Sequence, residues 1–512
     1  MKQGIVYLIG AGPGDPGLIT VKGLSCLRRA DVVIYDYLAN PSFLDAAPPH
    51  AERIYVGKRK GVHHLPQEEI NALLVEKARQ GKTVARLKGG DPYVFGRGGE
   101  EALHLHRAGV AFEVIPGVTS SFAAAAYAGI PLTHRDFTTS LALVTGHENP
   151  EKKLSSLDWE KLATGVGTLV FYMGMANLPL IAGELMAHGR AADTPVAVIR
   201  WATTPRQETL VATLGTLVEK VRQSGIKPPA IIIVGEVVNL RDELRWFDNR
   251  PLFGKRILVT RSAEQAGAFS ALLEEQGAEA MACPVIEIYP PSDTSDLDEA
   301  IAALSGIDYL VLTSANAVQA FFSRLEACGK DVRALHGVEV AVVGPKTAEA
   351  LALCGLKPDL VARDFRAEGV LEILREHGVA GKRILYPRAE LARELIPKEL
   401  AAAGAVVLAP VAYCSRLPAD GERIREILAA GDIDAITFTA SSTVDNFVAL
   451  VGADAAALVS EIPLFSIGPL TSQTMARHGL SVAAESDPST LEAMVATMIA
   501  QFTRGGSSPQ TP

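Results

Sequence analysis

Hydrophobic positions along this chain gather in short β-branched runs, and longer alanine- and leucine-rich stretches separate many of them. β-Branched residues favour strands, because their side chains pack well on a pleated surface. The runs that predict strands are Gly4–Ile9, Val32–Tyr35, Leu141–Thr145, Thr168–Tyr172, Ile231–Val234, Arg256–Thr260, Tyr309–Thr313, Glu339–Val343, Arg383–Tyr386, Ala435–Thr439 and Pro463–Ile467. This alternation of strands and helices predicts an α/β protein with largely parallel sheets.

A boundary is predicted near residues 241–255, where RDELRWFDNRPLFGK is rich in charge and then carries Pro251 and Gly254. A new strand follows it, so we interpret residues 246–254 as a linker. Trp246 and Phe247 predict that part of this linker docks. The end of the chain, residues 506–512, lacks apolar periodicity and is predicted to be a disordered tail.

The second half contains an internal repeat. Residues 312–318 (LTSANAV) match residues 438–444 (FTASSTV), and residues 342–347 (VVGPKT) match residues 466–471 (SIGPLT). The two matches are offset by 126 and 124 residues, in the same order. This pattern indicates two quasi-equivalent lobes, and a cleft between such lobes is a natural ligand site.

Composition narrows the class of protein. A length of 512 residues predicts three or four domains, at about 150 residues each. The net charge of −9 argues against non-specific nucleic-acid binding. No signal peptide and no membrane span are expected, which favours the cytoplasm. The cysteines form no CxxC pair and favour buried thiols over a metal site or disulfides; they are Cys26, Cys283, Cys328, Cys354 and Cys414.

The first strand leads into the glycine-rich turn GAGPGDPG at residues 10–17, and a helix is expected after it. A P-loop is excluded, because Leu18 and Ile19 stand where Lys and Ser or Thr would be needed. A dinucleotide-binding turn is disfavoured, because Pro13 and Pro16 remove amide donors that a pyrophosphate would use. A plain strand-to-helix turn without a ligand remains the simplest alternative for this motif alone.

Further motifs in the first half point to one family. They are VYLIGAGPGDPGLIT at 6–20, RLKGGDPYVFGRGGEE at 86–101, VIPGVTSSFAAAA at 114–126, TGH at 145–147, LVFYMG at 169–174, TTPRQ at 203–207 and AIIIVGEVV at 230–238. In this order, over about residues 4–245, they closely resemble uroporphyrinogen-III C-methyltransferase. The resemblance implies two αβα subdomains, at about 1–118 and 119–245, and a homodimer. It also implies S-adenosylmethionine bound between the subdomains, S-adenosylhomocysteine as by-product, no metal, and precorrin-2 as the product for sirohaem or cobalamin.

Carried over motif by motif, the resemblance implies cofactor contacts from Pro13, Gly89, Gly90, Asp91, Val94, Thr119, Ser120, Met173 and Ala202. Ser120 stands where the family more often has alanine, and Ala202 stands where glycine is common. Met173 taken alone is as well explained by core packing.

The resemblance makes Asp36, which ends the second strand, a proton acceptor near the tetrapyrrole, and Lys58 its proton-donor counterpart. A solvent-facing carboxylate at a strand end is the alternative for Asp36. The substrate carries eight carboxylates, so a local basic set is a candidate for binding or steering it. The set consists of Lys58, Arg59, Lys60, Arg86, Lys88 and Arg97.

The second half resembles uroporphyrinogen-III synthase through KRILVTR, LTSANAV, VVGPKTAEAL, ILYPRA, VAYCS, FTASSTVDNF and SIGPLTSQTMARHGL, in that order over residues 255–505. The resemblance implies a bilobal α/β fold joined by two extended crossings. One lobe would comprise 255–285 plus 415–505, and the other 290–410. The implied reaction is closure of linear hydroxymethylbilane with inversion of the last ring and loss of water.

Hydroxyl groups where strands meet helix N-termini can bind the substrate's carboxylates, with simple N-capping as the alternative. These substrate-binding candidates are Thr313, Ser314, Thr347, Thr439, Ser441, Ser442 and Thr471. Tyr413, in VAYCS, matches the family's cleft tyrosine and is the candidate for assisting departure of the hydroxyl group. A buried tyrosine that satisfies a backbone group is the alternative. Two rival functions are a nicotinamide-dependent oxidoreductase that uses the first turn, and a non-catalytic bilobal binding module in the second half.

Overall fold

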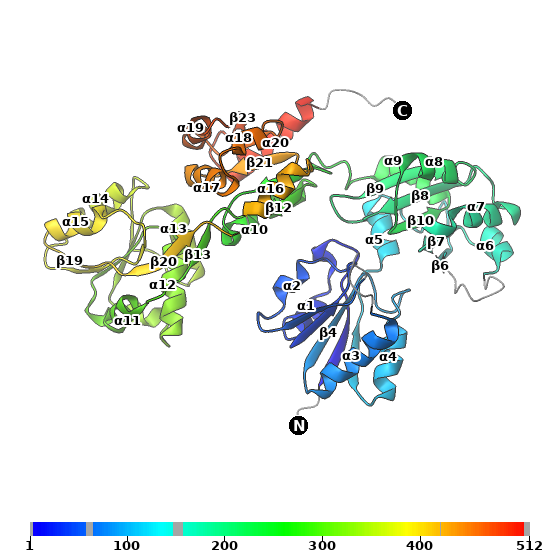
Figure 1. Cartoon of the computed structure of the whole chain (residues 1–512), viewed down its shortest axis with the longest axis horizontal. Coiled ribbons are helices and arrows are strands. Elements are labelled where there is room, and N and C mark those ends of the chain that lie inside the picture. Colours follow the sequence, from blue (N-terminus) through cyan, green and yellow to red (C-terminus); the bar gives the residue numbers. More distant parts are fainter. Residues whose placement is uncertain (1–3, 58–64, 147–156, 420, 506–512) are drawn as a thin grey trace. The chain divides into compact units, whose positions relative to one another are not determined.

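The computed structural model describes residues 4–57, 65–146, 157–419 and 421–505 (Figure 1). Contacts divide the chain into two compact units. The first unit comprises Met1–Arg256 with Leu272–Glu279 and Ile499–Pro512, and the second comprises Ile257–Ala271 with Ala280–Met498. Lys58, Arg59, Lys60 and the predicted tail at 506–512 lie outside the described residues.

The first unit begins with a five-stranded parallel sheet in the order β3-β2-β4-β1-β5. Its strands are β1 (Ile5–Gly10), β2 (Val32–Tyr35), β3 (Glu52–Tyr55), β4 (Thr83–Lys88) and β5 (Ala111–Ile115). Side chains alternate along β1, so that Val6 and Leu8 pack toward α3 (Gln67–Arg79) and α4 (Gly98–Arg107). Ile9 packs on the other face, toward α1 (Val21–Leu27) and α2 (Phe43–Ala46). Figure 1 shows these two helices on the opposite side of the sheet from α3 and α4.

A second sheet follows in the order β6-β7-β10-β8-β9. Its strands are β6 (Leu141–Thr145), β7 (Thr168–Tyr172), β8 (Pro195–Arg200), β9 (Glu208–Thr213) and β10 (Ala230–Val234). β6 and β7 are parallel, but β10 and β9 run antiparallel to their neighbours, so the expectation of largely parallel sheets is wrong for this sheet. The connection between β8 and β9 is a short loop, residues 201–207, whereas a parallel pair needs a crossover of a dozen or more residues.

The helices of this part are α5 (Ser120–Tyr127), α6 (Trp159–Gly165), α7 (Leu178–Ala187), α8 (Leu217–Ser224) and α9 (Arg241–Leu244). The segment after α9 packs against the rest of the first unit, as its aromatic residues predict. Trp246 Nε1 donates a hydrogen bond of 2.9 Å to the Ala126 carbonyl. The Phe247 ring is 4% exposed and lies 4.8 Å from the Tyr127 ring.

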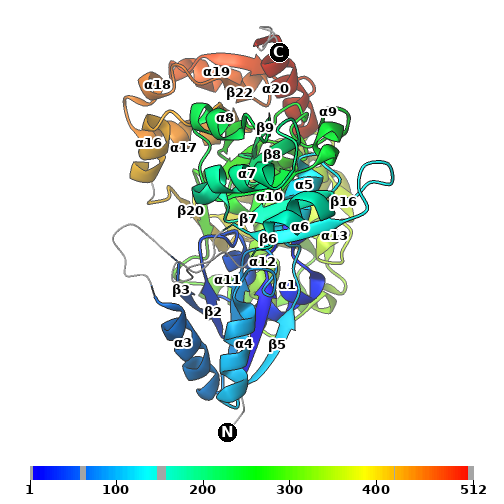
Figure 2. The same ribbon diagram turned by 90° about the vertical axis from the view of Figure 1, so that its right-hand side faces the viewer.

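One sheet of the second unit has the order β12-β11-β21-β22-β23. Its strands are β11 (Arg256–Val259), β12 (Glu279–Ala282), β21 (Ala435–Phe438), β22 (Leu464–Ser466) and β23 (Val482–Glu485). Its helices are α10 (Ala263–Glu275), α16 (Gly421–Ala429), α17 (Ser441–Val451), α18 (Ala455–Leu458), α19 (Pro469–Arg477) and α20 (Leu491–Gly505). Figure 2 shows α16, α17 and α18 gathered together, and a shared core joins them to Leu258 and Phe438 of the sheet.

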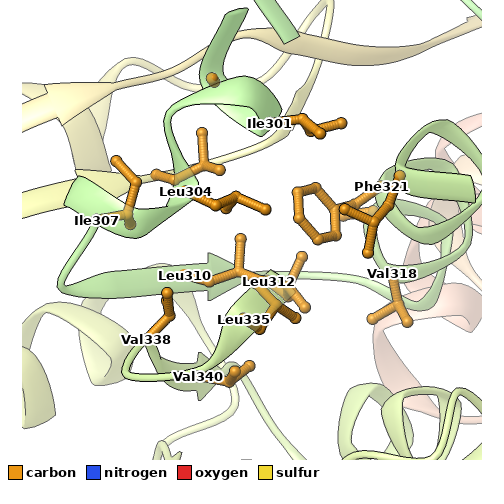
Figure 3. Packing of buried hydrophobic residues seen from close by; sticks show 14 of the residues in the cluster. Ile301, Leu304, Ile307, Leu310, Leu312, Val318, Phe321, Leu335, Val338 and Val340 are labelled. Atoms are coloured by element: carbon orange, nitrogen blue, oxygen red, sulfur yellow. The ribbon is translucent and has the colours of Figure 1, made fainter. Parts of the chain in front are cut away.

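The other sheet of the second unit has the order β16-β15-β14-β17-β19 and is parallel throughout. Its strands are β14 (Tyr309–Leu312), β15 (Glu339–Val342), β16 (Leu360–Val361), β17 (Arg383–Leu385) and β19 (Val406–Leu408), and its helices are α11 (Ser295–Ala302), α12 (Ala315–Ala327), α13 (Pro345–Leu353), α14 (Ala367–His377) and α15 (Leu395–Ala402). Figure 3 shows Leu310 and Leu312 of β14 packed beside Phe321 of α12.

Extended segments connect the two sheets of the second unit, in agreement with the expected bilobal fold. The chain leaves the first sheet through β13 (Glu287–Tyr289) and returns through β20 (Val411–Arg416), and the two strands pair antiparallel (Figure 1). The short strand β18 (Arg388–Ala389) pairs with the other edge of β20. Tyr413 therefore lies on one of the two connections.

In the described ranges, no helix combines the length and the apolar character needed to cross a membrane. The five cysteines form no disulfide; three are buried, whereas Cys328 and Cys354 are half-buried.

Candidate active sites

The glycine-rich turn after β1 pairs with the GGDP motif after β4. Gly12 donates a backbone hydrogen bond of 3.2 Å to Gly90, and Gly90 returns one of 2.7 Å. Ala11 N also donates to the Lys88 carbonyl at 2.8 Å. Gly12 and Gly90 have φ angles of +74° and +67°, a conformation that glycine adopts without a Cβ clash. The two motifs, almost eighty residues apart in the chain, therefore form one backbone platform.

A third glycine loop closes on this platform. A Cβ on Gly117 would lie 2.4 Å from the Gly90 carbonyl oxygen, and a Cβ on Gly10 would lie 2.5 Å from Gly117 N. The carboxylate of Asp91 ties the same loops together, since its Oδ2 accepts from Gly117 N at 3.0 Å and its Oδ1 accepts from Tyr93 N at 2.8 Å. The contact requires glycine at these positions, because any side chain would push the loops apart.

Strained backbone is concentrated in the same motifs. In the part of the chain that the structure describes, every non-glycine residue with positive φ lies in the first unit: Phe95, Arg97, Met173, Trp201 and Thr203. Such conformations persist where the surroundings enforce them, and they cluster at functional sites. Met173, with φ of 53°, is 51% exposed, which rules out the alternative of a core methionine.

Three more predicted contacts of the first unit, Thr119, Val94 and Ala202, lie around Tyr172. The Tyr172 hydroxyl lies 2.7 Å from Thr119 Oγ1, donates to Ser121 Oγ at 2.7 Å and accepts from Ser121 N at 3.2 Å. Thr119 is 5% exposed, and the Phe95 ring lies 4.8 Å from the Tyr172 ring. Val94 packs against the same core, which also contains Ala202. These contacts bring residues of the two sheets of the first unit together.

Asp15 forms a second link between the first turn and the TTPRQ loop. Its backbone N–H donates to Thr203 Oγ1 at 2.9 Å, and its carboxylate accepts from the Tyr127 hydroxyl at 2.6 Å. Burial and then this hydrogen bond raise the pKa of Tyr127, so the phenol stays protonated and keeps its role as donor. Pro13 is held in the same turn, where Asn40 donates to the Gly14 carbonyl at 2.7 Å.

Asp36 is held by a buried arginine. Arg86 Nη2 donates to Asp36 Oδ2 at 3.1 Å, and the Asp36 side chain is 21% exposed. The alternative of a freely solvated strand-end carboxylate therefore does not describe Asp36. Asp36 Oδ1 accepts from Leu38 N at 3.1 Å, and a Cβ on Gly89 would lie 2.6 Å from Leu38 Cβ. This close approach places the Asp36 loop beside the GGDP motif.

Arg86 and Lys88 are internal charges rather than exposed binding groups. Their side chains are 4% and 6% exposed, and both donate to Oε1 of the fully buried Glu101, at 3.3 and 2.9 Å. Burial, with the nearby Arg86 charge, lowers the pKa of Lys88. Arg97 is exposed and forms an ion pair of 2.6 Å with Glu100. The structure thus assigns Arg86 and Lys88 to a buried network instead of the predicted basic surface.

In the second unit, hydroxyl groups meet where β14 and β17 end. Ser314 caps α12 by accepting from Ala317 N at 3.0 Å, and its Oγ lies 3.1 Å from the Tyr413 hydroxyl. Thr313 lies beside the buried Tyr386, whose pKa is raised mainly by burial. The Tyr413 hydroxyl therefore meets a side chain rather than a backbone group, contrary to the alternative for that residue.

The other substrate-binding candidates lie at the corresponding helix starts. Ser441, the first residue of α17, donates from Oγ to the Leu470 carbonyl at 3.1 Å. Ser442 is exposed and Thr439 is half-buried. Thr347 and Thr471 lie in the first turns of α13 and α19, and each is only 3% exposed.

Several residues of these sites escaped the sequence reasoning. Glu101 is the last residue of the RLKGGDPYVFGRGGEE string, yet only the fold shows that it neutralises Arg86 and Lys88. Tyr172 precedes Met173 and Tyr386 lies in ILYPRA. Both tyrosines therefore belong to motifs used in the sequence analysis, but those motifs assign no role to either residue. A buried acid four residues into a helix carries no local signal that separates it from a solvated one.

Two family models match the chain. Residues 5–218 match the tetrapyrrole (corrin/porphyrin) methylases, and residues 267–496 match uroporphyrinogen-III synthase HemD. Both matches follow the order of the two units.

Individual relatives agree with the family models. The chain is 38% identical to the "Porphyrin biosynthesis protein HemD" of Ruminiclostridium josui over 97% of both chains. It is 54% identical to the uroporphyrinogen-III C-methyltransferase of Priestia megaterium, over 46% of this chain and 99% of that protein. A solved uroporphyrin-III C-methyl transferase from Thermus thermophilus, complexed with S-adenyl homocysteine, is 44% identical, with a TM-score of 0.40, over 46% of this chain and 99% of that one.

Proposed function

The chain belongs to the porphyrin-biosynthesis family that joins a tetrapyrrole methylase to a uroporphyrinogen-III synthase, and from this membership we propose that it catalyses two consecutive reactions. The synthase, over residues 255–505, closes hydroxymethylbilane to uroporphyrinogen III with inversion of the last ring and loss of water. The methyltransferase, over residues 1–245, then methylates two ring carbons to give precorrin-2, the precursor of sirohaem and cobalamin.

The observation that carries the first activity is the backbone platform of Gly12 and Gly90, closed by Gly117. Main-chain segments that pack this closely, with strained residues beside them, suit a ligand that binds main-chain groups at short range. S-adenosylmethionine, when bound there, supplies a methyl group on a sulfonium. The residues that would hold it are Pro13, Gly89, Gly90, Asp91, Val94, Thr119, Ser120, Met173 and Ala202.

Asp36 acts on the tetrapyrrole in this proposal. Carbon methylation of an electron-rich pyrrole needs positioning and later removal of a proton, and a carboxylate accepts that proton. Arg86 Nη2 donates to Asp36 Oδ2 at 3.1 Å and orients the carboxylate. Lys58 serves as the counterpart that returns a proton.

The synthase proposal rests on the hydroxyl groups at the strand ends. Tyr413, 3.1 Å from Ser314 Oγ, assists departure of the substrate's hydroxyl group. Hydroxyls and free amides at helix starts bind the substrate's carboxylates without a metal. The positions are Thr313, Ser314, Thr347, Thr439, Ser441, Ser442 and Thr471.

We extend the proposal to assembly and location. A homodimer forms through the methyltransferase half, as the family resemblance implies, and the enzyme acts in the cytoplasm without nucleic-acid or membrane partners. Light scattering of the purified chain tests the dimer, and a monomer at micromolar concentration would contradict it.

Incubation with hydroxymethylbilane tests both activities. Without S-adenosylmethionine, the product expected is uroporphyrinogen III, whereas closure without inversion gives the symmetric isomer. With S-adenosylmethionine, two methyl groups per tetrapyrrole are expected. Binding of a nicotinamide dinucleotide without binding of S-adenosylmethionine would instead support an oxidoreductase. Tight binding of the bilane without turnover would support a binding module.

A further inference from the structure

Arg261 lies just beyond the end of strand β11. β11 lies between β12, the next strand along the chain, and β21, which returns to the sheet from the far end of the unit. The strand order therefore changes direction at β11. In open α/β sheets, ligands bind outside the carboxyl ends of the strands where the order reverses. Arg261 stands directly at this end of β11.

Among the side chains that the structure describes, the Arg261 guanidinium has no acid partner. Its Nη2 donates to Gln265 Oε1 at 3.1 Å, and its Nε is buried without any hydrogen-bond partner. Burial lowers the pKa of Arg261. Arg261 as a whole is half-buried, but an enclosed, positively charged Nε–H without a partner is unfavourable in a folded protein unless a ligand supplies the counter-charge.

A second polar group beside Arg261 is also unsatisfied. Ser262 is 6% exposed, and its Oγ is buried without a hydrogen-bond partner. Ser262 precedes α10, a helix of 13 residues, and its carbonyl accepts from Gln265 N and Ala266 N. Its side chain does not cap that helix in the described residues. An arginine Nε–H and a serine hydroxyl are thus both left without partners at one helix start.

Two threonine hydroxyls close to Arg261 do form hydrogen bonds, so a hydroxyl without a partner is not common to this part of the sheet. Thr260 Oγ1 donates to the Thr437 carbonyl at 2.7 Å, and Thr437 Oγ1 donates to the Leu258 carbonyl at 3.1 Å. These bonds join β11 to β21 just before Arg261. Arg190 differs from Arg261 in having hydrogen-bond partners. Burial also lowers the pKa of Arg190, but backbone carbonyls, such as that of Ala163 at 2.9 Å, accept hydrogen bonds from its guanidinium.

We propose that Arg261 and Ser262 bind one carboxylate of the linear tetrapyrrole substrate, an inference that rests on the synthase function proposed above. A carboxylate accepts two parallel hydrogen bonds from the guanidinium fork, and a third from the serine hydroxyl. The helix start adds a favourable field for an anion. Arg261 is then a substrate-binding cation in a chain whose net charge is −9.

The steady-state kinetics of ring closure test this site in the full chain. Arg261→Gln should raise the KM for hydroxymethylbilane about tenfold, because it removes a charge-assisted hydrogen bond to the substrate's carboxylate. The kcat should change much less. Arg261→Lys should give an intermediate KM, since it keeps the charge and loses the fork. Ser262→Ala should raise KM by a smaller factor. Added KCl should raise the KM of wild type more than that of Arg261→Gln.

Arg423→Gln is the matched control, because Arg423 is exposed on α16 and its loss removes the same charge. It should leave KM and kcat unchanged. An unchanged KM in Arg261→Gln, or a lower kcat with a lower thermal midpoint and the same KM, would overturn the proposal. If Arg261→Gln fails to fold, the KM of Arg261→Lys and Ser262→Ala decides. A wild-type chain that forms no uroporphyrinogen III would instead refute the synthase function itself.

Discussion

The Lys88 ammonium and the Glu101 carboxylate form an ion pair of 2.9 Å in which the side chains are 6% and 0% exposed. The same Glu101 oxygen accepts from Arg86, and Arg86 in turn holds Asp36. The network links the interior of the first sheet to the proposed proton acceptor. Its charges balance, with two acids and two bases, which is the condition for keeping them buried.

Glu101→Gln should lower the free energy of unfolding of the first unit by about 3 kcal/mol, because it leaves two cations buried with one acid. Adding Lys88→Met should recover much of the loss by removing the unpaired charge. All three tryptophans, Trp159, Trp201 and Trp246, lie in the first unit, so urea denaturation followed by tryptophan fluorescence reports on it. Equal stability of Glu101→Gln and wild type would show that the pair contributes nothing.

Gly117→Ala should weaken S-adenosylmethionine binding about tenfold or more, since overpacking costs about 1–3 kcal/mol and the new Cβ would lie 2.4 Å from the Gly90 carbonyl oxygen. Gly99→Ala is the control, because a Cβ there meets nothing within 4 Å. Calorimetric titration measures both. If Gly117→Ala binds S-adenosylmethionine with wild-type affinity, the glycine platform is not part of the site that binds this methyl donor.

Asp36→Asn should lower the kcat of methyl transfer by about 10²-fold, the lower end of the range for general acid–base groups. The affinity for S-adenosylmethionine should stay unchanged, because Asp36 acts on the tetrapyrrole. Asp45→Asn, an exposed acid of α2, serves as the control. A full-rate Asp36→Asn enzyme would exclude the proton-acceptor role.

Tyr413→Phe should slow ring closure about tenfold with little change in KM. The factor is below the roughly 10²–10⁴ of typical general acids, because the substrate's hydroxyl group departs readily. Tyr289→Phe is the matched control, since its ring stays in place beneath Arg416. Stopped-flow measurement of uroporphyrinogen III formation distinguishes them, and an equal rate in both variants argues against Tyr413.

The Asp298–Arg324 pair should make the second unit sensitive to acid. Hydrogen bonding from Arg324 lowers the pKa of Asp298 from 3.8 to about 2. Folding therefore favours the charged carboxylate of Asp298. The stability that the ion pair contributes to the second unit is present at neutral pH and is lost as the pH falls from about 4 toward 2. Hydrogen exchange in α11 and α12 should be faster in Asp298→Asn than in wild type at pH 7, with the difference shrinking in acid. Glu326→Gln, exposed on α12, should match wild type at each pH.

Strand positions were predictable because short β-branched runs carry their own signal. Thr168–Tyr172 and Leu141–Thr145 form strands with the predicted bounds, and Tyr309–Thr313 differs by one residue. The direction of pairing was not predictable in the same way. Sheet β6-β7-β10-β8-β9 is mostly antiparallel, and for the pair β8–β9 residues 201–207 decide this because they are too short for a parallel crossover.

The candidate sites divide along similar lines. Asp36, Gly90 and Tyr413 are candidates that motifs alone suggest, since each lies in a string of residues with a recognisable order. The burial of Arg86 and the unsatisfied Nε of Arg261 were not, because a basic residue looks the same in sequence whether it is solvated or enclosed.

Contiguous residues by themselves determined the α/β class, the succession of a methylase half and a synthase half, and the glycine-rich turn, because local propensity and motif spacing act within a few residues. The tertiary structure alone decided that Gly12, Gly90 and Gly117 share one platform, and that Glu101 neutralises Arg86 and Lys88. Such contacts join segments far apart in the chain. They depend on how whole sheets and helices pack, which no short stretch of sequence encodes.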